Sequence, residues 1–171
     1  MSTRAGSAPL PSPEDLARLV SKVTEQMCSL PFSLAAPEAS AALEALRAPT
    51  ARASKIWIEG PRALAVAIVL DLKSAKTAAS AAFALPAEEV DGDMIDDLLR
   101  EFVNIIAGQI NILLKLDHSL GLPSAVEPRE ILDPSQWHGT LLQNEGESLI
   151  LWVAVGATSP GGSPERDCKR G

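Results

Sequence analysis

The chain has 171 residues, of which 46% are apolar and 22% are charged, and its formal net charge is −7. This length and apolar content predict one folded domain with its own core and exclude a wholly disordered chain. The acidic balance argues against nucleic acid and anionic membrane surfaces as partners. The sequence shows neither a secretory leader nor an apolar run near the roughly 20 residues that span a bilayer, so we expect a cytoplasmic protein with reduced cysteines.

The first fifty residues predict a tail, a helix and a connection. Residues 1–11 are small, polar and proline-containing, which is typical of a disordered tail. Ser12 is a good N-cap residue, and apolar residues then recur at helical spacing until Pro31 stops the helix. Residues 31–50 are rich in Ala and Pro, and they leave open a connector, a short strand or a helical turn.

A hairpin and an Ala-rich helix are predicted next. Residues 54–59 and 63–70 are rich in β-branched and other apolar residues, and a Gly-Pro turn separates them. They predict two antiparallel strands, the second more buried than the first. Residues 74–85 predict an Ala-rich helix, which Pro86 ends.

The strongest predicted helix covers residues 93–116, where acidic residues crowd the N-terminal end that the helix dipole favours. Residues 137–143 and 148–155 flank a polar turn and predict a second hairpin, and the composition of residues 156–171 predicts a disordered tail. We therefore expect an α/β (α+β) domain over residues 12–155. Its mostly antiparallel sheet is built from the hairpins and packed by the N-terminal, Ala-rich and long helices.

The long helix carries a polar stripe along one side. With an advance of about 100° per residue, Asp97, Glu101, Asn104 and Gly108 fall on this side. Glu101 and Asn104 are three residues apart, so their side chains are neighbours. A glycine inside a helix costs about 1 kcal/mol relative to Ala, and its place in the stripe favours the close approach of a partner. Asn111 shares this side, and spacing alone does not prefer Asn104 to it.

The opposite side of the long helix is predicted to face the core. Its apolar residues are Ile95, Leu98, Leu99, Phe102, Ile106 and Leu113. Gln109 falls on this side too and, if buried, needs a hydrogen-bond partner. Because a polar helix face is commonly just solvated, the stripe by itself does not distinguish a functional site from an ordinary surface.

The spacing Asp97-x-x-x-Glu101-x-x-Asn104, followed by Ile-Ile-Ala-Gly up to Gly108, resembles the active-site helix of the CheC/CheX/FliY chemotaxis phosphatases. The hairpin and Ala-rich helix before this motif, and the Leu-Pro-x-x-Val segment after it, resemble the family in the same order. The resemblance covers roughly residues 54–127. Only one Glu-x-x-Asn motif is present, which is similar to the single-site CheX type and implies a homodimer.

The resemblance implies a phosphatase that removes the aspartyl phosphate of a CheY-like response-regulator receiver domain, in chemotaxis or two-component signalling. Asn104 would orient the attacking water, since a neutral amide both accepts and donates hydrogen bonds. Glu101 would engage a lysine of the receiver, and Asp97, Arg100 and Gly108 would contribute to partner binding. Mg²⁺ is expected in the receiver, while the chain itself needs no cofactor or metal.

Two residues depart from the family pattern. Arg100 stands where the family usually has a small residue, and it could pair with Glu101 in competition with the partner's lysine. Phe102 is bulkier than usual. Arg100 favours a second hypothesis, in which the chain is a catalytically weak or inactive CheX-like binding module for a receiver or another signalling partner. In a third hypothesis the chain is a structural dimerisation domain whose stripe is only solvated.

The remaining polar and aromatic candidates predict structure rather than chemistry. Asp91 and Asp93 lack the spacing of a calcium loop and are better explained as charges at a helix N-terminus. His118 and His138 fall in connecting or edge segments, where a lone histidine is commonplace. Three tryptophans in predicted strands are expected in the core or in an interface. They are Trp57, Trp137 and Trp152.

Overall fold

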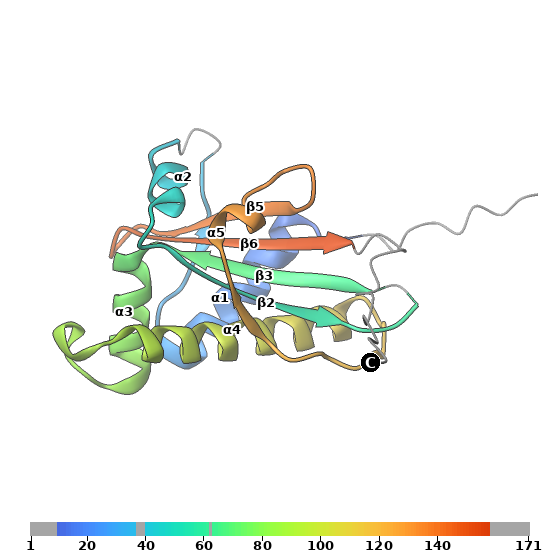
Figure 1. Ribbon diagram of the computed structural model, residues 1–171, viewed down its shortest axis with the longest axis horizontal. Coiled ribbons are helices and arrows are strands. Elements are labelled where there is room, and N and C mark those ends of the chain that lie inside the picture. The colour runs from blue at the N-terminus through green and yellow to red at the C-terminus, as the bar shows by residue number, and fades with distance from the viewer. Residues whose placement is uncertain (1–9, 37–39, 62, 158–171) are drawn as a thin grey trace, which may run out of the picture.

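The computed structural model describes residues 10–36, 40–61 and 63–157, which form a six-stranded sheet in the order β1-β5-β6-β3-β2-β4 (Figure 1). Every pair of neighbouring strands is antiparallel, as predicted. The strands are β1 (Ser33–Leu34), β2 (Arg52–Ile58), β3 (Leu64–Leu70), β4 (Ser124–Val126), β5 (His138–Asn144) and β6 (Leu149–Ala157). The helices are α1 (Pro13–Cys28), α2 (Ser40–Arg47), α3 (Leu72–Phe83), α4 (Gly92–Leu113) and α5 (Pro128–Ile131), with a 3₁₀ turn η1 (Ala87–Glu89).

Both predicted hairpins are confirmed. β2 pairs with β3 along its whole length, and β5 pairs with β6. β3 lies between β2 and β6, and every residue of it is buried, which accounts for its unbroken apolar run. β6 extends to Ala157, two residues beyond the predicted strand, and its Gly156 lies against the ring of Trp137.

The helix starts follow the expected capping chemistry. Ser12 Oγ accepts a hydrogen bond from the backbone N–H of Asp15 at 3.1 Å, so α1 begins where predicted. It ends at Cys28, before Pro31, because Ser29 adopts a left-handed conformation with φ 56°. The segment 31–50 contains both β1 and α2, whereas β4 and α5 were not predicted at all.

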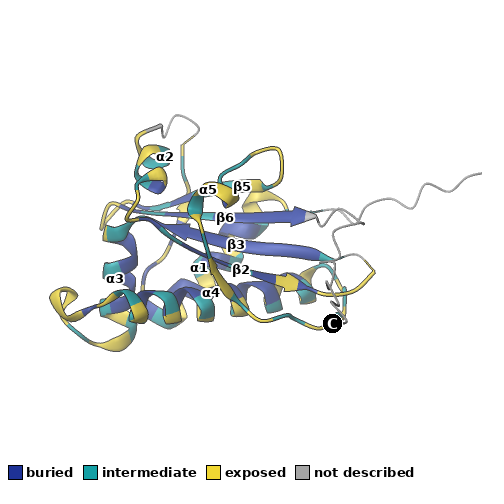
Figure 2. Ribbon diagram, in the orientation of Figure 1, coloured by how far each residue is buried: buried dark blue, intermediate teal, exposed yellow. Residues whose placement is uncertain are grey.

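The sheet separates two apolar clusters of unequal size. α1, α3 and α4 pack on one face against alternate strand residues such as Ile56, Val66 and Ile68. The short helices α2 and α5 cover part of the other face through Leu46 and Ile131. Figure 2 shows the buried residues of β3 and β6 inside the molecule and the exposed residues along the outer side of α4. α4 therefore presents one long side to the outside.

The predicted tails fall largely on residues 1–9 and 158–171, which lie outside the described residues, as does Cys168. None of the helices in the described ranges has the length and apolar character needed to cross a bilayer.

Cys28 is a buried free thiol at the end of α1. Burial raises the pKa of this thiol from 9.0 to about 11, and a backbone contact with Leu30 lowers it by less. Because the folded thiol keeps its proton more tightly than the unfolded one, its contribution to stability is complete below pH 9 and is lost as the pH rises toward 11.

In a Cys168→Ser variant we expect native Cys28 to resist a thiol reagent at pH 8. Modification as fast as in denaturant would contradict this.

Candidate active site

α4 is packed against the core from Ile95 to Ile110, so the side chains on the outer side of this stretch have a rigid support. Asp91 caps its N-terminus by accepting a hydrogen bond from Met94 N–H at 2.9 Å, which agrees with its interpretation as a charge at a helix N-terminus. Eight of its residues are buried against the sheet and the neighbouring helices. They are Ile95, Leu98, Leu99, Phe102, Val103, Ile106, Ala107 and Ile110.

The prediction for the C-terminal end of this helix was partly wrong. Leu113 is 45% exposed rather than part of the core, and Gln109 is exposed and needs no buried partner. The helix ends at Leu113, three residues before its predicted end, because Lys115 adopts a left-handed conformation with φ 52°. The chain turns away there, so the last turn has less of the protein to pack against.

The outer side of α4 holds Glu101 and Asn104, both exposed. Neither side chain makes a hydrogen bond or an ion pair with any other residue in the described ranges. Gly108 follows one turn later, and a Cβ added there would lie 3.9 Å from Leu120 Cδ1, an ordinary contact. The fold itself therefore does not require glycine at this position, and the approach of a partner remains a prediction.

The second amide on this side of the helix has a structural task. Asn111 donates from Nδ2 to the carbonyl oxygen of His118 at 2.7 Å, and its Oδ1 accepts from the His118 backbone N–H at 3.2 Å. These two bonds hold the segment after α4 against the helix, beside Gly108. Both ends of the Asn111 amide are thus used in hydrogen bonds within the protein. Asn104 is the amide on this side that has no partner among the described residues and can bind another molecule.

Replacing Asn111 with Ala is expected to destabilise the protein by about 1–3 kcal/mol, because two partly buried backbone groups lose their partners. The midpoint of urea unfolding measures this effect. Asn111→Asp is a useful companion, since the carboxylate keeps an acceptor for the His118 N–H but loses the donor. If Asn111→Ala is as stable as the wild type, the two hydrogen bonds between Asn111 and His118 are not formed in solution.

Arg100 does not pair with Glu101, contrary to the competition that the sequence suggested. Its guanidinium Nη1 lies 3.0 Å from Asp97 Oδ1, one turn earlier, and the side chains of Arg100 and Asp97 are 43% and 70% exposed. The nearby Asp96 is held instead by Arg52 of β2 at 3.3 Å. The carboxylate of Glu101 is consequently left without a cationic partner among the described residues.

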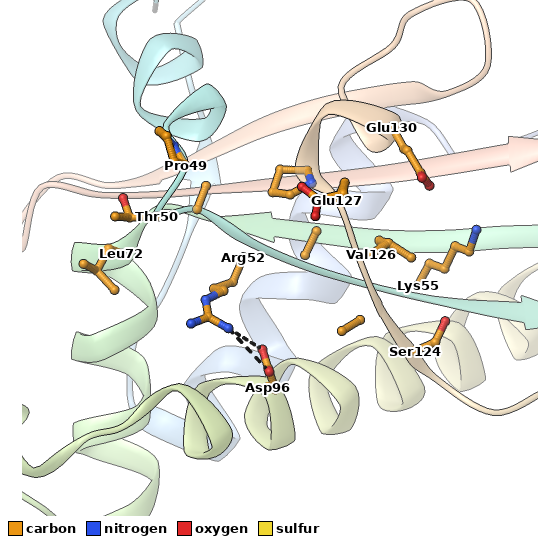
Figure 3. Close-up of a pocket in the computed structure, with 14 residues that line it drawn as sticks. Pro49, Thr50, Arg52, Lys55, Leu72, Asp96, Ser124, Val126, Glu127 and Glu130 are labelled. Carbon is orange, nitrogen blue, oxygen red and sulfur yellow. Dashed lines mark hydrogen bonds and ion pairs between the residues drawn. The ribbon is translucent and has the colours of Figure 1, made fainter.

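A shallow cleft of about 870 Å³ borders this side of the helix between β2, β4 and the N-terminal half of α4. In Figure 3 the side chains of Arg52 and Asp96 point toward each other across it, with Lys55, Glu127 and Glu130 farther along. Charges of both signs line the cleft, and neither Glu101 nor Asn104 does. The cleft and the polar stripe are therefore adjacent but separate surfaces.

The other candidates take structural positions. The ring of His118 lies over Gly60, whose φ is 144° and whose missing side chain leaves room for it. Trp57 is 37% exposed and stacks under Lys55 Nζ at 5.7 Å, so it belongs to the surface rather than to the core. No cluster of three or more metal-ligating side chains occurs within the described ranges.

The structure places the five residues singled out in the sequence along the outer side of α4, and they are Asp97, Arg100, Glu101, Asn104 and Gly108. The sequence did not predict the segment after α4 that runs back beside this helix and brings Leu120 close to Gly108. A turn of this kind is usually marked by a glycine in the left-handed conformation. Here Lys115 and Asp117 adopt that conformation, so no glycine marks the turn.

The comparisons with known proteins agree with this arrangement. The family model "Chemotaxis phosphatase CheX" matches residues 53–138, half of the 171 residues. No curated protein matches the chain by sequence. Among solved structures, CheX from the CheX–CheY–BeF₃–Mg²⁺ complex of Borrelia burgdorferi superposes with a TM-score of 0.64 at 15% identity, covering 88% of this chain and 100% of that one.

Two further structures have the same fold. The chemotaxis protein CheX of Vibrio vulnificus gives a TM-score of 0.63 at 12% identity, with 84% of this chain and 93% of that chain covered. FliY of Thermotoga maritima gives 0.53 at 12% identity, with 86% and 91% covered. At these identities the superpositions establish the fold, and the family model, which spans the hairpin, α3 and α4, establishes the family. The chain therefore belongs to the CheX family of chemotaxis phosphatases.

Proposed function

We propose that this chain is a phosphatase that hydrolyses the aspartyl phosphate of a CheY-like receiver domain in chemotaxis or two-component signalling. The observation that carries the proposal is the pair Glu101 and Asn104, exposed and unpaired on a helix that is otherwise fixed to the core. Family membership supports it, and so does the complex of the Borrelia relative with CheY, BeF₃ and Mg²⁺.

The reaction needs little from the phosphatase beyond positioning. Water attacks the phosphorus, the bond between phosphorus and the aspartyl oxygen breaks, and the products are the receiver's carboxylate and inorganic phosphate. Holding the water in line with the breaking bond lowers the entropic part of the barrier. Asn104 suits this task because its amide accepts from water, donates a second hydrogen bond and stays neutral near the phosphoryl group.

Glu101 is assigned to the partner. A carboxylate facing a phosphoryl group would repel it, so we place Glu101 against the lysine of the receiver that the family resemblance implies. We assign the Mg²⁺ to the receiver, as the family resemblance implies, and the complex of the Borrelia relative contains Mg²⁺ and BeF₃ together with CheY. Asp97, Arg100 and Gly108 extend the contact along α4. We also propose that the protein forms a homodimer and that it works in the cytoplasm.

The test is to mix the purified protein with CheY-type receiver domains from the same organism, phosphorylated with acetyl phosphate, and to follow phosphate loss. We expect faster loss from at least one receiver, with binding that strengthens when the receiver carries beryllofluoride. Binding without acceleration would favour the adaptor hypothesis. If neither binding nor acceleration occurs with any receiver, the stripe is merely solvated and the proposal is wrong.

A further inference from the structure

Arg100 is placed beside the group proposed to hold the water. It precedes Asn104 by four residues, so the two side chains are neighbours about 6 Å apart at Cβ, and the two residues lie within about 40° of each other around the helix. The Arg100 side chain is 43% exposed and can reach beyond the helix surface. In the free protein the guanidinium is turned the other way, toward Asp97, and it must leave that ion pair to reach the space above Asn104.

The anchor that holds Arg100 in the free protein is weak. Its ion pair with Asp97 lies at the surface, and exposed pairs of this kind contribute little because water and salt screen them. The alternative carboxylate one turn away, Asp96, is already paired with Arg52. Among the described residues, the Arg100 guanidinium thus has one weakly bound partner, Asp97, and it lies next to a site proposed to receive an anion.

We infer that Arg100 is a catalytic residue that leaves Asp97 when the phosphorylated receiver docks and donates hydrogen bonds to the phosphoryl oxygens. The inference rests on the proposed function. During in-line attack, negative charge is spread over the three equatorial oxygens of the phosphoryl group. A planar guanidinium binds two of them at once, and it works best in the water-poor space between two proteins.

Arg100 takes no part in the covalent change. The attacking water supplies the new P–O bond and both protons of the product phosphate, and the receiver's aspartate leaves with the electrons of the broken bond. Mg²⁺ and the lysine of the receiver already neutralise part of the charge, so Arg100 adds to an existing stabilisation.

The experiment compares Arg100→Gln, Arg100→Lys and Arg47→Gln under single-turnover conditions, with the phosphatase saturating a phosphorylated receiver. Arg47 is the matched control, since it forms the same kind of exposed i,i+3 pair, with Glu44 at 3.3 Å, on the helix covering the other face of the sheet. We expect Arg100→Gln to lower the limiting rate by about 10- to 100-fold. Arg100→Lys should retain part of the rate, and Arg47→Gln should equal the wild type.

Affinity for the beryllofluoride-loaded receiver separates catalysis from docking. We expect this affinity to fall in Arg100→Gln, because the guanidinium also contacts the phosphoryl mimic, but by a smaller factor than the limiting rate, since the contact strengthens as charge spreads in the transition state. An unchanged or higher limiting rate would overturn the inference, as would a loss confined to affinity. If either result is obtained while the wild type accelerates dephosphorylation and Asn104→Ala does not, only the role of Arg100 is wrong and the proposed function stands. If the wild type itself has no activity, both proposals are wrong.

Discussion

Replacing Asn104 with Ala is expected to reduce the acceleration of receiver dephosphorylation by about 100-fold or more, because the attacking water loses the group that orients it. The side chain is exposed and bonded to no other described residue, so its removal should leave the fold intact. Phosphate loss from the phosphorylated receiver measures the effect, and circular dichroism verifies the fold.

Gln109→Ala is the matched control for this variant. Gln109 is an exposed amide on the same helix, but it faces the groove toward Arg18 and Lys22 of α1. Its truncation should leave the rate at the wild-type value. If the two variants lose activity equally, the loss reflects a general effect on α4 and not the orientation of a water molecule by Asn104.

Replacing Phe102 with Ala should destabilise the protein by about 3–5 kcal/mol, the largest stability effect we expect from one substitution on α4. Phe102 is 1% exposed and lies between Glu101 and Asn104 in sequence, on the opposite side of the helix. Its ring anchors the turn that carries Glu101 and Asn104. The midpoint and slope of denaturant unfolding measure the loss.

Phe102→Leu keeps most of the apolar volume and is expected to cost less than about 1.5 kcal/mol, so it serves where the Ala variant does not fold. Leu113→Ala provides a comparison on the same helix, since Leu113 is 45% exposed and should lose far less. A similar loss at positions 102 and 113 would mean that α4 is not packed as described.

Much of the fold was predictable because local signals agreed with one another. Ser12 and Pro13 marked the start of α1, and the unbroken apolar run of residues 64–70 marked a central strand. The features that were missed depend on contacts between distant segments. β4 is three residues long and exists because Ser124–Val126 pairs with the edge of β2. No pattern within such a short stretch predicts it.

The helix face that carries the candidate site could be predicted from the sequence, but the bonds that its side chains make could not. Spacing alone could not separate Asn104 from Asn111, since both lie on the same side of α4. The distinction comes from the turn after the helix, which brings the backbone of His118 within reach of Asn111. The partner of Arg100 was equally open, because its side chain can reach more than one carboxylate and Arg52 occupies Asp96.

The limiting rate of phosphate loss at saturating protein is the most direct test, because at saturation the bound state is full and only the chemical step is observed. If the carboxamide of residue 104 steers a water molecule onto the receiver's phosphorus, the Ala variant will bind the beryllofluoride-loaded receiver normally and turn over far more slowly. A variant that binds poorly but reaches the wild-type limiting rate would show that this side chain serves docking alone.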